Sequence, residues 1–226
     1  MRTKTLLLTA ALSAAGIASS MAQAVYSVNA VGYVNTQLVP GFNLVSNPLD
    51  NKTGNTIGNL FGTGLAGGIP DGLSVYYFDP NIDDYVSGLY ESILGGWQPA
   101  SAANQVVPPG EGVFVFWPGT ANGTNTFVGE VLQAAASNQQ IPPGFSIKGS
   151  TVPIAGTVTS MNFPVADGDS IYRWDTTIDD YVSYLYESIL GGWQPSTPSL
   201  AVGEAAFVFK AGTTPVTWTR NFTINQ

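Results

Sequence analysis

The sequence of 226 residues contains no cysteine and no histidine. Without cysteine the chain has no disulfide, no thiol nucleophile and no thiolate metal site. Without histidine it lacks the usual general base, the commonest zinc ligand and the base of a Ser-His pair. These two absences exclude the most frequent catalytic and zinc-binding arrangements.

Basic residues are scarce as well. Charged residues make up only 10% of the chain, and seven basic residues stand against fifteen acidic ones, for a formal net charge of −8. The sequence has no basic stripe to neutralise the phosphates of nucleic acid and no basic cluster to bind anionic lipid. We therefore expect neither nucleic acid nor a membrane surface as a partner.

The first 24 residues have the three parts of a secretory signal peptide. Arg2 and Lys4 form a basic start, residues 6–18 are apolar, and Ala-Gln-Ala at 22–24 is typical of a cleavage site. The apolar stretch is short for a bilayer span of about 20 residues, and no later stretch resembles one. We expect residues 1–24 to be removed and the remaining chain, with a net charge of −10 from five basic and fifteen acidic residues, to be periplasmic or extracellular.

One stretch of eighteen residues occurs twice. The letters IDDYVSGLYESILGGWQP span 82–99 and IDDYVSYLYESILGGWQP span 178–195, so that only Gly88 and Tyr184 differ. Similarity continues on both sides, from PGFNLVSNPL against PGFSIKGSTV to GEGVFVFWPGT against GEAAFVFKAGT, with three fewer residues after Gln-Pro in the second copy. The sequence thus predicts a tandem duplication, with a lead-in strand and the first unit at 25–133 and the second unit at 134–226.

The amino-acid composition and the positions of glycine and proline predict strands. The chain has 26 glycines and 15 prolines, and these bound short β-branched and aromatic runs such as LSVYYFD and VFVFW. We expect an all-β fold of two tandem duplicated small sandwich or barrel-like units packed together, with at most short helical turns. Whether the units are separate domains or halves of one pseudo-symmetric domain stays open at this point.

The repeated block itself fits two structures. As a helix it would begin at a capping Asp84 and place Tyr85, Leu89 and Ile93 on one stripe. As a strand it would run between an acidic turn and a second turn at Gly95-Gly96. The strand is favoured because Gly88 weakens a helix interior. Tyrosine would overfill a packed core at this position, so we expect Tyr184 to point into solvent, a groove or a partner.

Alternating oxygen side chains suggest calcium at the start of each block. The pattern then departs from a calcium loop, because the sixth position is an aspartate rather than glycine and the acid expected at the twelfth comes one step late. An ordinary acidic β-turn explains the same letters. The candidate ligands are Asp79, Asn81 and Asp83 in the first copy and Asp175, Thr177 and Asp179 in the second.

Carboxylates and aromatic rings are the remaining chemical groups. Acidic residues such as Glu91 and Glu187 could serve a glycoside hydrolase if two lay at the right separation, but turn and surface roles explain them equally. Aromatic side chains, among them Trp117 and Trp174, could stack on sugar rings, or they could be core residues of β-units. The aromatic candidates for contact with a partner are Trp97, Tyr184, Tyr186 and Trp193.

Several motifs together resemble a known group of proteins. These are VYSVNAVGYVN after the cleavage site, VPGFNLVSNPL, an Asp-Gly turn before VYYFD, GGWQP, and PPGEGVFVFW. In order and spacing they are similar to uncharacterised secreted all-β repeat proteins of Verrucomicrobia-like bacteria. The resemblance implies no activity, so it assigns no catalytic or binding residue.

From the sequence we expect an exported, non-catalytic structural or surface/matrix binding protein without a cofactor, unless calcium is bound. Its partner is unknown and could be an extracellular polysaccharide or another surface protein. The alternative is a carbohydrate-binding protein with one aromatic site per repeat, and a glycoside hydrolase is less favoured because no catalytic constellation stands out.

Overall fold

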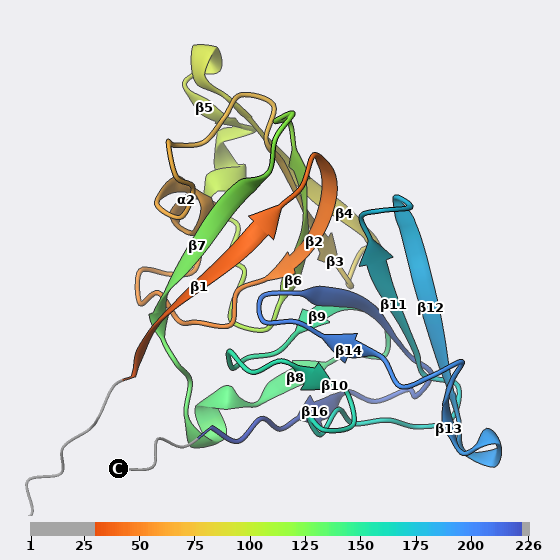
Figure 1. Cartoon of the computed structure of the whole chain (residues 1–226). Coiled ribbons are helices and arrows are strands. Elements are labelled where there is room, and N and C mark those ends of the chain that lie inside the picture. The colour runs from red at the N-terminus through yellow and green to blue at the C-terminus, as the bar shows by residue number, and fades with distance from the viewer. Residues whose placement is uncertain (1–29, 223–226) are drawn as a thin grey trace, which may run out of the picture.

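The chain folds into two related units of antiparallel β-strands, each built around one five-stranded sheet (Figure 1). The structure is a computed structural model and describes residues 30–222. The expected signal peptide at 1–24 lies outside the described residues. The mostly β architecture, with two similar sheets packed together, confirms the fold class predicted from the repeat.

The first unit has the sheet order β2-β6-β3-β4-β5, with β1 and β7 paired as a separate ribbon. Its helical segments are α2 (Ile57–Gly62) and two short 3-10 helices, η1 (Ser92–Leu94) and η2 (Ala100–Asn104). The strands are β1 (Val31–Leu38), β2 (Gly41–Ser46), β3 (Ser74–Asp79), β4 (Asp84–Glu91), β5 (Gly96–Gln98), β6 (Gly112–Trp117) and β7 (Gly123–Glu130).

The second unit repeats this arrangement with the order β13-β12-β11-β15-β9. Its 3-10 helix η4 (Ser188–Leu190) corresponds to η1, while η3 (Ala134–Ser137) lies between the units. No helix within residues 30–222 is long and apolar enough to cross a membrane. The sheet strands are β9 (Gly144–Gly149), β11 (Ser170–Asp175), β12 (Asp180–Glu187), β13 (Gly192–Gln194) and β15 (Ala205–Lys210), and the paired short strands are β8 (Gln139–Ile141) with β16 (Val216–Trp218) and β10 (Gly156–Thr157) with β14 (Ser199–Leu200).

The repeated block forms strands in both copies, which confirms the favoured prediction. It supplies β4 and β12, each of which pairs with the preceding strand, so that Phe78 lies opposite Tyr85. The chain then turns through η1 or η4 and ends at a glycine in the left-handed region, Gly95 with φ 84° and Gly191 with φ 83°. A left-handed residue costs glycine little, which explains the Gly-Gly pair in each block.

Each sheet covers a core of its own unit with one face. Side chains alternate along a strand, so in β3 Val75 and Tyr77 face the first core while Tyr76 and Phe78 face the other way. The β1–β7 ribbon covers the first core with Leu38 and other residues, and Trp218 of β16 is fully buried in the second core.

The opposite faces of the two sheets pack against each other and form a third core. Its buried members come from both units, and aromatic rings surround them. Both faces of β6 are therefore covered, which explains why its run VFVFW contains no alternating polar residue. The buried members of this interface core are Leu44, Phe78, Phe114, Ile147 and Ala205.

The contacts between the units obey an approximate two-fold symmetry. Ser46 N donates to Gly203 O at 2.9 Å, and the equivalent Gly149 N donates to Gly110 O at 2.8 Å. Among the rings, Phe114 and Trp174 have centroids 5.4 Å apart, and their counterparts Phe207 and Phe78 have centroids 4.9 Å apart. The two units are thus halves of one pseudo-symmetric arrangement.

Small residues permit the close approach of the sheets. A Cβ added to Gly112 would lie 2.3 Å from a methyl carbon of Ile147 and 2.6 Å from the Cβ of Ala205. Nearby, the buried ammonium of Lys148 in the second unit forms an ion pair with the carboxylate of Glu111 in the first. The side chain of Lys148 is 4% exposed and that of Glu111 is 23% exposed, and this ion pair joins β9 of the second unit to the turn before β6 of the first.

Candidate functional site

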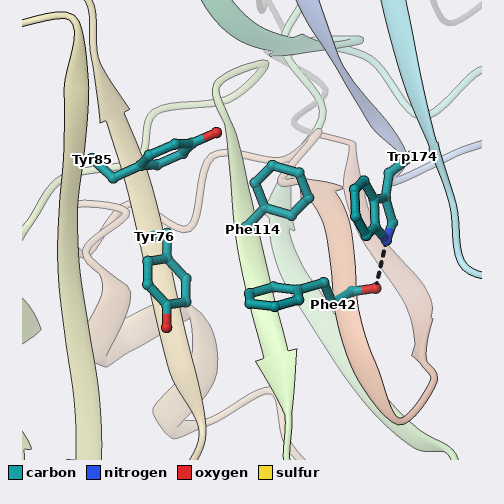
Figure 2. Close-up of a pocket in the computed structure, with 5 residues that line it drawn as sticks. All are labelled: Phe42, Tyr76, Tyr85, Phe114 and Trp174. Carbon is teal, nitrogen blue, oxygen red and sulfur yellow. Dashed lines mark hydrogen bonds between the residues drawn. The ribbon is translucent and has the colours of Figure 1, made fainter. Parts of the chain in front are cut away.

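A cavity lies at the junction of the two sheets. It has a volume of about 290 Å³ and is lined only by aromatic residues. Figure 2 shows the rings gathered around it, with Trp174 on the side of the second unit. We call it the first aromatic pocket, and it is formed by Phe42, Tyr76, Tyr85, Phe114 and Trp174.

Strand periodicity places these rings together. Phe42 of β2, Tyr76 of β3 and Phe114 of β6 lie on the outward face of the first sheet, and Tyr76 is directly opposite Phe114 in the register. Tyr85 of β4 lies on the same face and contacts Tyr76 edge-on, with ring centroids 6.4 Å apart. Four neighbouring strands therefore each contribute one ring.

Trp174 closes the pocket from β11 of the second unit. Its indole nitrogen donates a hydrogen bond to the backbone oxygen of Phe42 at 2.9 Å (Figure 2). The indole also meets Phe114 edge-on, with an interplanar angle of 89°. Because its polar atom is paired and its ring is packed, Trp174 has a fixed orientation and offers only carbon to the pocket.

A second aromatic pocket occupies the symmetry-related place. It has a volume of about 300 Å³. Each of its residues is the counterpart of one in the first pocket, whereas Phe78, the counterpart of Trp174, is buried at 8% exposure and does not line it. The second aromatic pocket is formed by Phe145, Tyr172, Tyr181 and Phe207.

Two tyrosines connect the pockets near the pseudo-symmetry axis. Tyr85 lines the first pocket and Tyr181 lines the second, and their side chains share a hydrogen bond. Burial raises the pKa of both phenols above the ordinary value of 10.0. Both hydroxyls therefore stay neutral at physiological pH, and neither supplies a charge to the pockets.

A polar cavity of about 260 Å³ also borders Trp174. It also lies between the units, because β1 and β2 of the first unit and the loop before β15 contribute to it. Glu204 in this cavity accepts hydrogen bonds from Arg173 and from the backbone of Ala201, so its carboxylate is already paired. The other polar side chains that line it include those of Asn35, Gln37 and Thr176.

The two block tryptophans lie in the cores of their units. Trp97 and Trp193 are each 7% exposed, and each packs edge-on against the tyrosine of the preceding strand. That tyrosine is Tyr90 in the first unit and Tyr186 in the second, and both pack against their cores. These positions give the predicted partner residues Trp97, Tyr186 and Trp193 little free ring surface.

Tyr184, which we expected to point into solvent, a groove or a partner, is half-buried and packs against the second core. Its side chain also hydrogen-bonds Arg173. Contact of its remaining surface with a partner stays a prediction. The equivalent Gly88 lies under η2, where an added Cβ would be 2.6 Å from the Cβ of Ala102. No 3-10 helix follows β13 in the second unit, so the tyrosine ring occupies space that η2 covers in the first.

The proposed calcium ligands cap tight turns. Asp79 accepts hydrogen bonds from the backbone and side-chain nitrogens of Asn81, and Asp175 accepts two from Thr177. Hydrogen bonding with Thr177 lowers the pKa of Asp175 below 3.8. Within residues 30–222 no three acidic side chains group as a metal site. Calcium binding at Asp79, Asn81, Asp83, Asp175, Thr177 and Asp179 stays a prediction, which calcium-dependent melting would test.

Sequence reasoning identified one residue of the first aromatic pocket, Trp174, and missed the other four. The available signal was the repeat itself, because Phe42, Tyr76, Tyr85 and Phe114 each have an aromatic counterpart in the second unit. These rings alternate along their strands with residues of the unit cores. An apolar residue at every position of a strand indicates that both faces are covered, and the second cover is the other unit.

In comparisons with protein families, curated proteins and solved structures, the chain matches none of them.

Proposed function

We propose that this chain is a non-catalytic binding protein and that the first aromatic pocket is its binding site. The observation that carries the proposal is a cavity at the junction of the units with walls made of five aromatic side chains. Among these walls the only polar atoms are two tyrosine hydroxyls and an indole nitrogen that is already hydrogen-bonded. Such walls bind apolar surface and offer no nucleophile or carboxylate for catalysis.

The size of the pocket indicates the kind of group that enters it. Pockets for small molecules usually measure about 300–1,000 Å³. At about 290 Å³ the first aromatic pocket is at the lower limit of that range. It suits one ring or one or two aliphatic side chains better than an extended ligand.

Calorimetric titration with 2-naphthol, a neutral aromatic probe, tests this proposal. We expect binding with a negative heat-capacity change, because apolar surface is buried. Tyr76→Ser should weaken it by about two- to tenfold, since a ring contact contributes about 0.5–1.5 kcal/mol. The matched control is Tyr33→Ser, which removes a tyrosine that is 74% exposed on β1 and should leave binding unchanged. An absence of binding, or equal effects of the two substitutions, would contradict the proposal.

Carbohydrate is a second candidate ligand, and the position of Trp174 favours it. The indole borders both the first aromatic pocket and the polar cavity that contains Asn35 and Gln37. Sugar recognition needs an aromatic face for the ring and adjacent hydrogen-bonding groups for its hydroxyls, and amide side chains supply both donors and acceptors.

A glycan array followed by titration of any bound glycan tests this candidate. Gln37→Ala should weaken glycan binding while leaving 2-naphthol binding intact, because Gln37 lines only the polar cavity. Gln140→Ala, in the second unit, is the matched amide control and should change neither. Failure of every glycan to bind would remove the carbohydrate candidate.

Export belongs to the same proposal, since residues 1–24 have the pattern of a signal peptide. N-terminal sequencing of the protein recovered from a bacterial periplasm or medium should begin at Val25. Recovery of uncleaved protein in the cytoplasm would contradict export.

A further inference from the structure

Each repeated block exposes an isoleucine and a leucine at the end of its hairpin. Ile93 and Leu94 in η1 are 88% and 64% exposed, and Ile189 and Leu190 in η4 are 90% and 58% exposed. We call Ser92–Leu94 and Ser188–Leu190 the two tips. Side chains this exposed add little to the stability of the fold, since apolar groups stabilise only when removed from water. The same apolar surface is nevertheless presented twice.

Hydrogen bonds hold the tips in shape. The carboxylate of Asp71 accepts from the backbone nitrogen of Ser92 at 2.6 Å and from its hydroxyl at 2.8 Å. Asp167 holds Ser188 in the same way and at the same distances. A left-handed glycine ends each tip. Groups held in one conformation lose less entropy on binding, so the tips are pre-organised for a contact.

The tips and the aromatic pockets lie on different parts of the molecule. In Figure 1 the first tip is at the top, beside β5, and the second tip is at the lower right, beside β13. Both aromatic pockets lie between the two sheets instead. A second copy of the chain can therefore place one of its tips in a pocket while both units of the first copy keep their positions.

We propose that a tip of one copy inserts its isoleucine and leucine into an aromatic pocket of a second copy. The proposal rests on the binding role of the pocket and names its occupant. An aliphatic tip matches walls made only of rings, and a pocket of about 290 Å³ matches the size of one or two side chains. Residues 30–222 contain two tips and two aromatic pockets, so each tip has a pocket to enter on another copy.

This contact joins two different surfaces, so it does not close by itself into a two-fold dimer. Such heterologous contacts extend into chains or networks unless the geometry forms a ring. Two side chains in a pocket bury much less than the about 1,200 Å² of a stable interface, so a single contact is weak. A second, reciprocal contact between the same two chains closes a two-fold pair and raises the overall affinity, because this second contact is intramolecular in effect. Salt should strengthen assembly by screening the net charge of −10 on the chain without residues 1–24, which has five basic and fifteen acidic residues.

Sedimentation velocity of the chain lacking residues 1–24, from about 10 μM to about 1 mM, tests the proposal over the range expected for weak association. The wild-type protein should sediment faster with concentration. A tip variant with Ile93→Ser, Leu94→Ser, Ile189→Ser and Leu190→Ser should stay monomeric and still bind 2-naphthol. Ile154→Ser with Val165→Ser removes two other exposed apolar side chains and should leave assembly unchanged.

Mixing provides the decisive measurement. A pocket variant with Tyr76→Ser and Tyr172→Ser should also stay monomeric, yet an equimolar mixture with the tip variant should associate, because one supplies tips and the other pockets. A tip variant that assembles like wild type, or a mixture that stays monomeric while wild type assembles, overturns the proposal. A wild-type protein that is monomeric throughout but binds 2-naphthol or a glycan overturns the self-association alone and leaves the binding function standing.

Discussion

At the scale of single residues, position 88 shows how a side chain depends on the segment that covers it. Glycine is required in the first unit because Ala102 of η2 lies above it, and tyrosine fits in the second because no such helix follows β13. The second copy has three fewer residues after Gln-Pro, and Gly88 against Tyr184 is the only mismatch in the block. These two differences are linked, because the segment after Gln-Pro covers position 88 in the first unit. The sequence showed both but could not show that they touch.

Gly88→Ala should destabilise the protein. The new Cβ would lie 2.6 Å from the Cβ of Ala102 and 3.2 Å from the indole of Trp97, so η2 must shift. Overpacking of this kind costs about 1–3 kcal/mol, which urea unfolding followed by circular dichroism can measure.

Gly62→Ala in α2 is the control, because an added Cβ there meets nothing within 4 Å. Since alanine favours a helix over glycine by about 0.5–1 kcal/mol, this variant should be neutral or slightly more stable. Equal losses in the two variants would show that Gly88 is not constrained by packing.

At the scale of elements, strands were predictable and their partners were not. Short runs of Val, Tyr and Phe between Gly and Pro predicted β3, β4 and β6 and their counterparts β11, β12 and β15, and Gly88 favoured the strand over the helix for β4. Periodicity also put Tyr76 and Phe78 on one face of β3. It could not show that this face meets the second unit, because contacts distant in sequence leave no local pattern.

The order of each tip should depend on pH. Hydrogen bonds from Ser92 lower the pKa of Asp71 below its ordinary value of 3.8. The ordering that they supply is therefore fully present above about pH 3.8 and is lost as the pH falls through the lower pKa of the folded state. NMR relaxation should show amide order parameters at Ile93 and Leu94 falling from about 0.85 to below about 0.6 in acid.

Asp71→Ala should loosen the first tip in the same way at neutral pH. The second tip is an internal control in that variant, because Asp167 still holds Ser188. If the first tip stays as ordered as the second, the hydrogen bonds of Asp71 do not determine its shape.

At the scale of the whole molecule, the interface core couples the units. It contains large rings from both sheets, and backbone hydrogen bonds cross it at two symmetric places. An interface this apolar resembles the interior of one domain rather than a contact between movable domains. Duplication was evident in the sequence, whereas the pairing of the duplicated faces required coordinates.

The protein should therefore unfold in one transition. Scanning calorimetry should give equal calorimetric and van't Hoff enthalpies. Phe114→Ala, which removes a buried ring from the interface, should cost about 3–5 kcal/mol. Hydrogen exchange should then show equal loss of protection at Val75 in the first core and Ile171 in the second. Two resolved transitions, or a loss confined to the first unit, would show that the units are independent.

The ends of the described chain have a consequence for the order of the units. Ala30 and Phe222 both pack against the first core, so the two ends approach the same region although almost the whole chain separates them. The first unit is synthesised before the second because η3 connects its end to the start of the second unit. The symmetric contacts between the units do not depend on that order. A circularly permuted chain, opened near η3 and joined at these ends, would keep every strand pairing of both sheets and reverse the order in which the halves leave the ribosome.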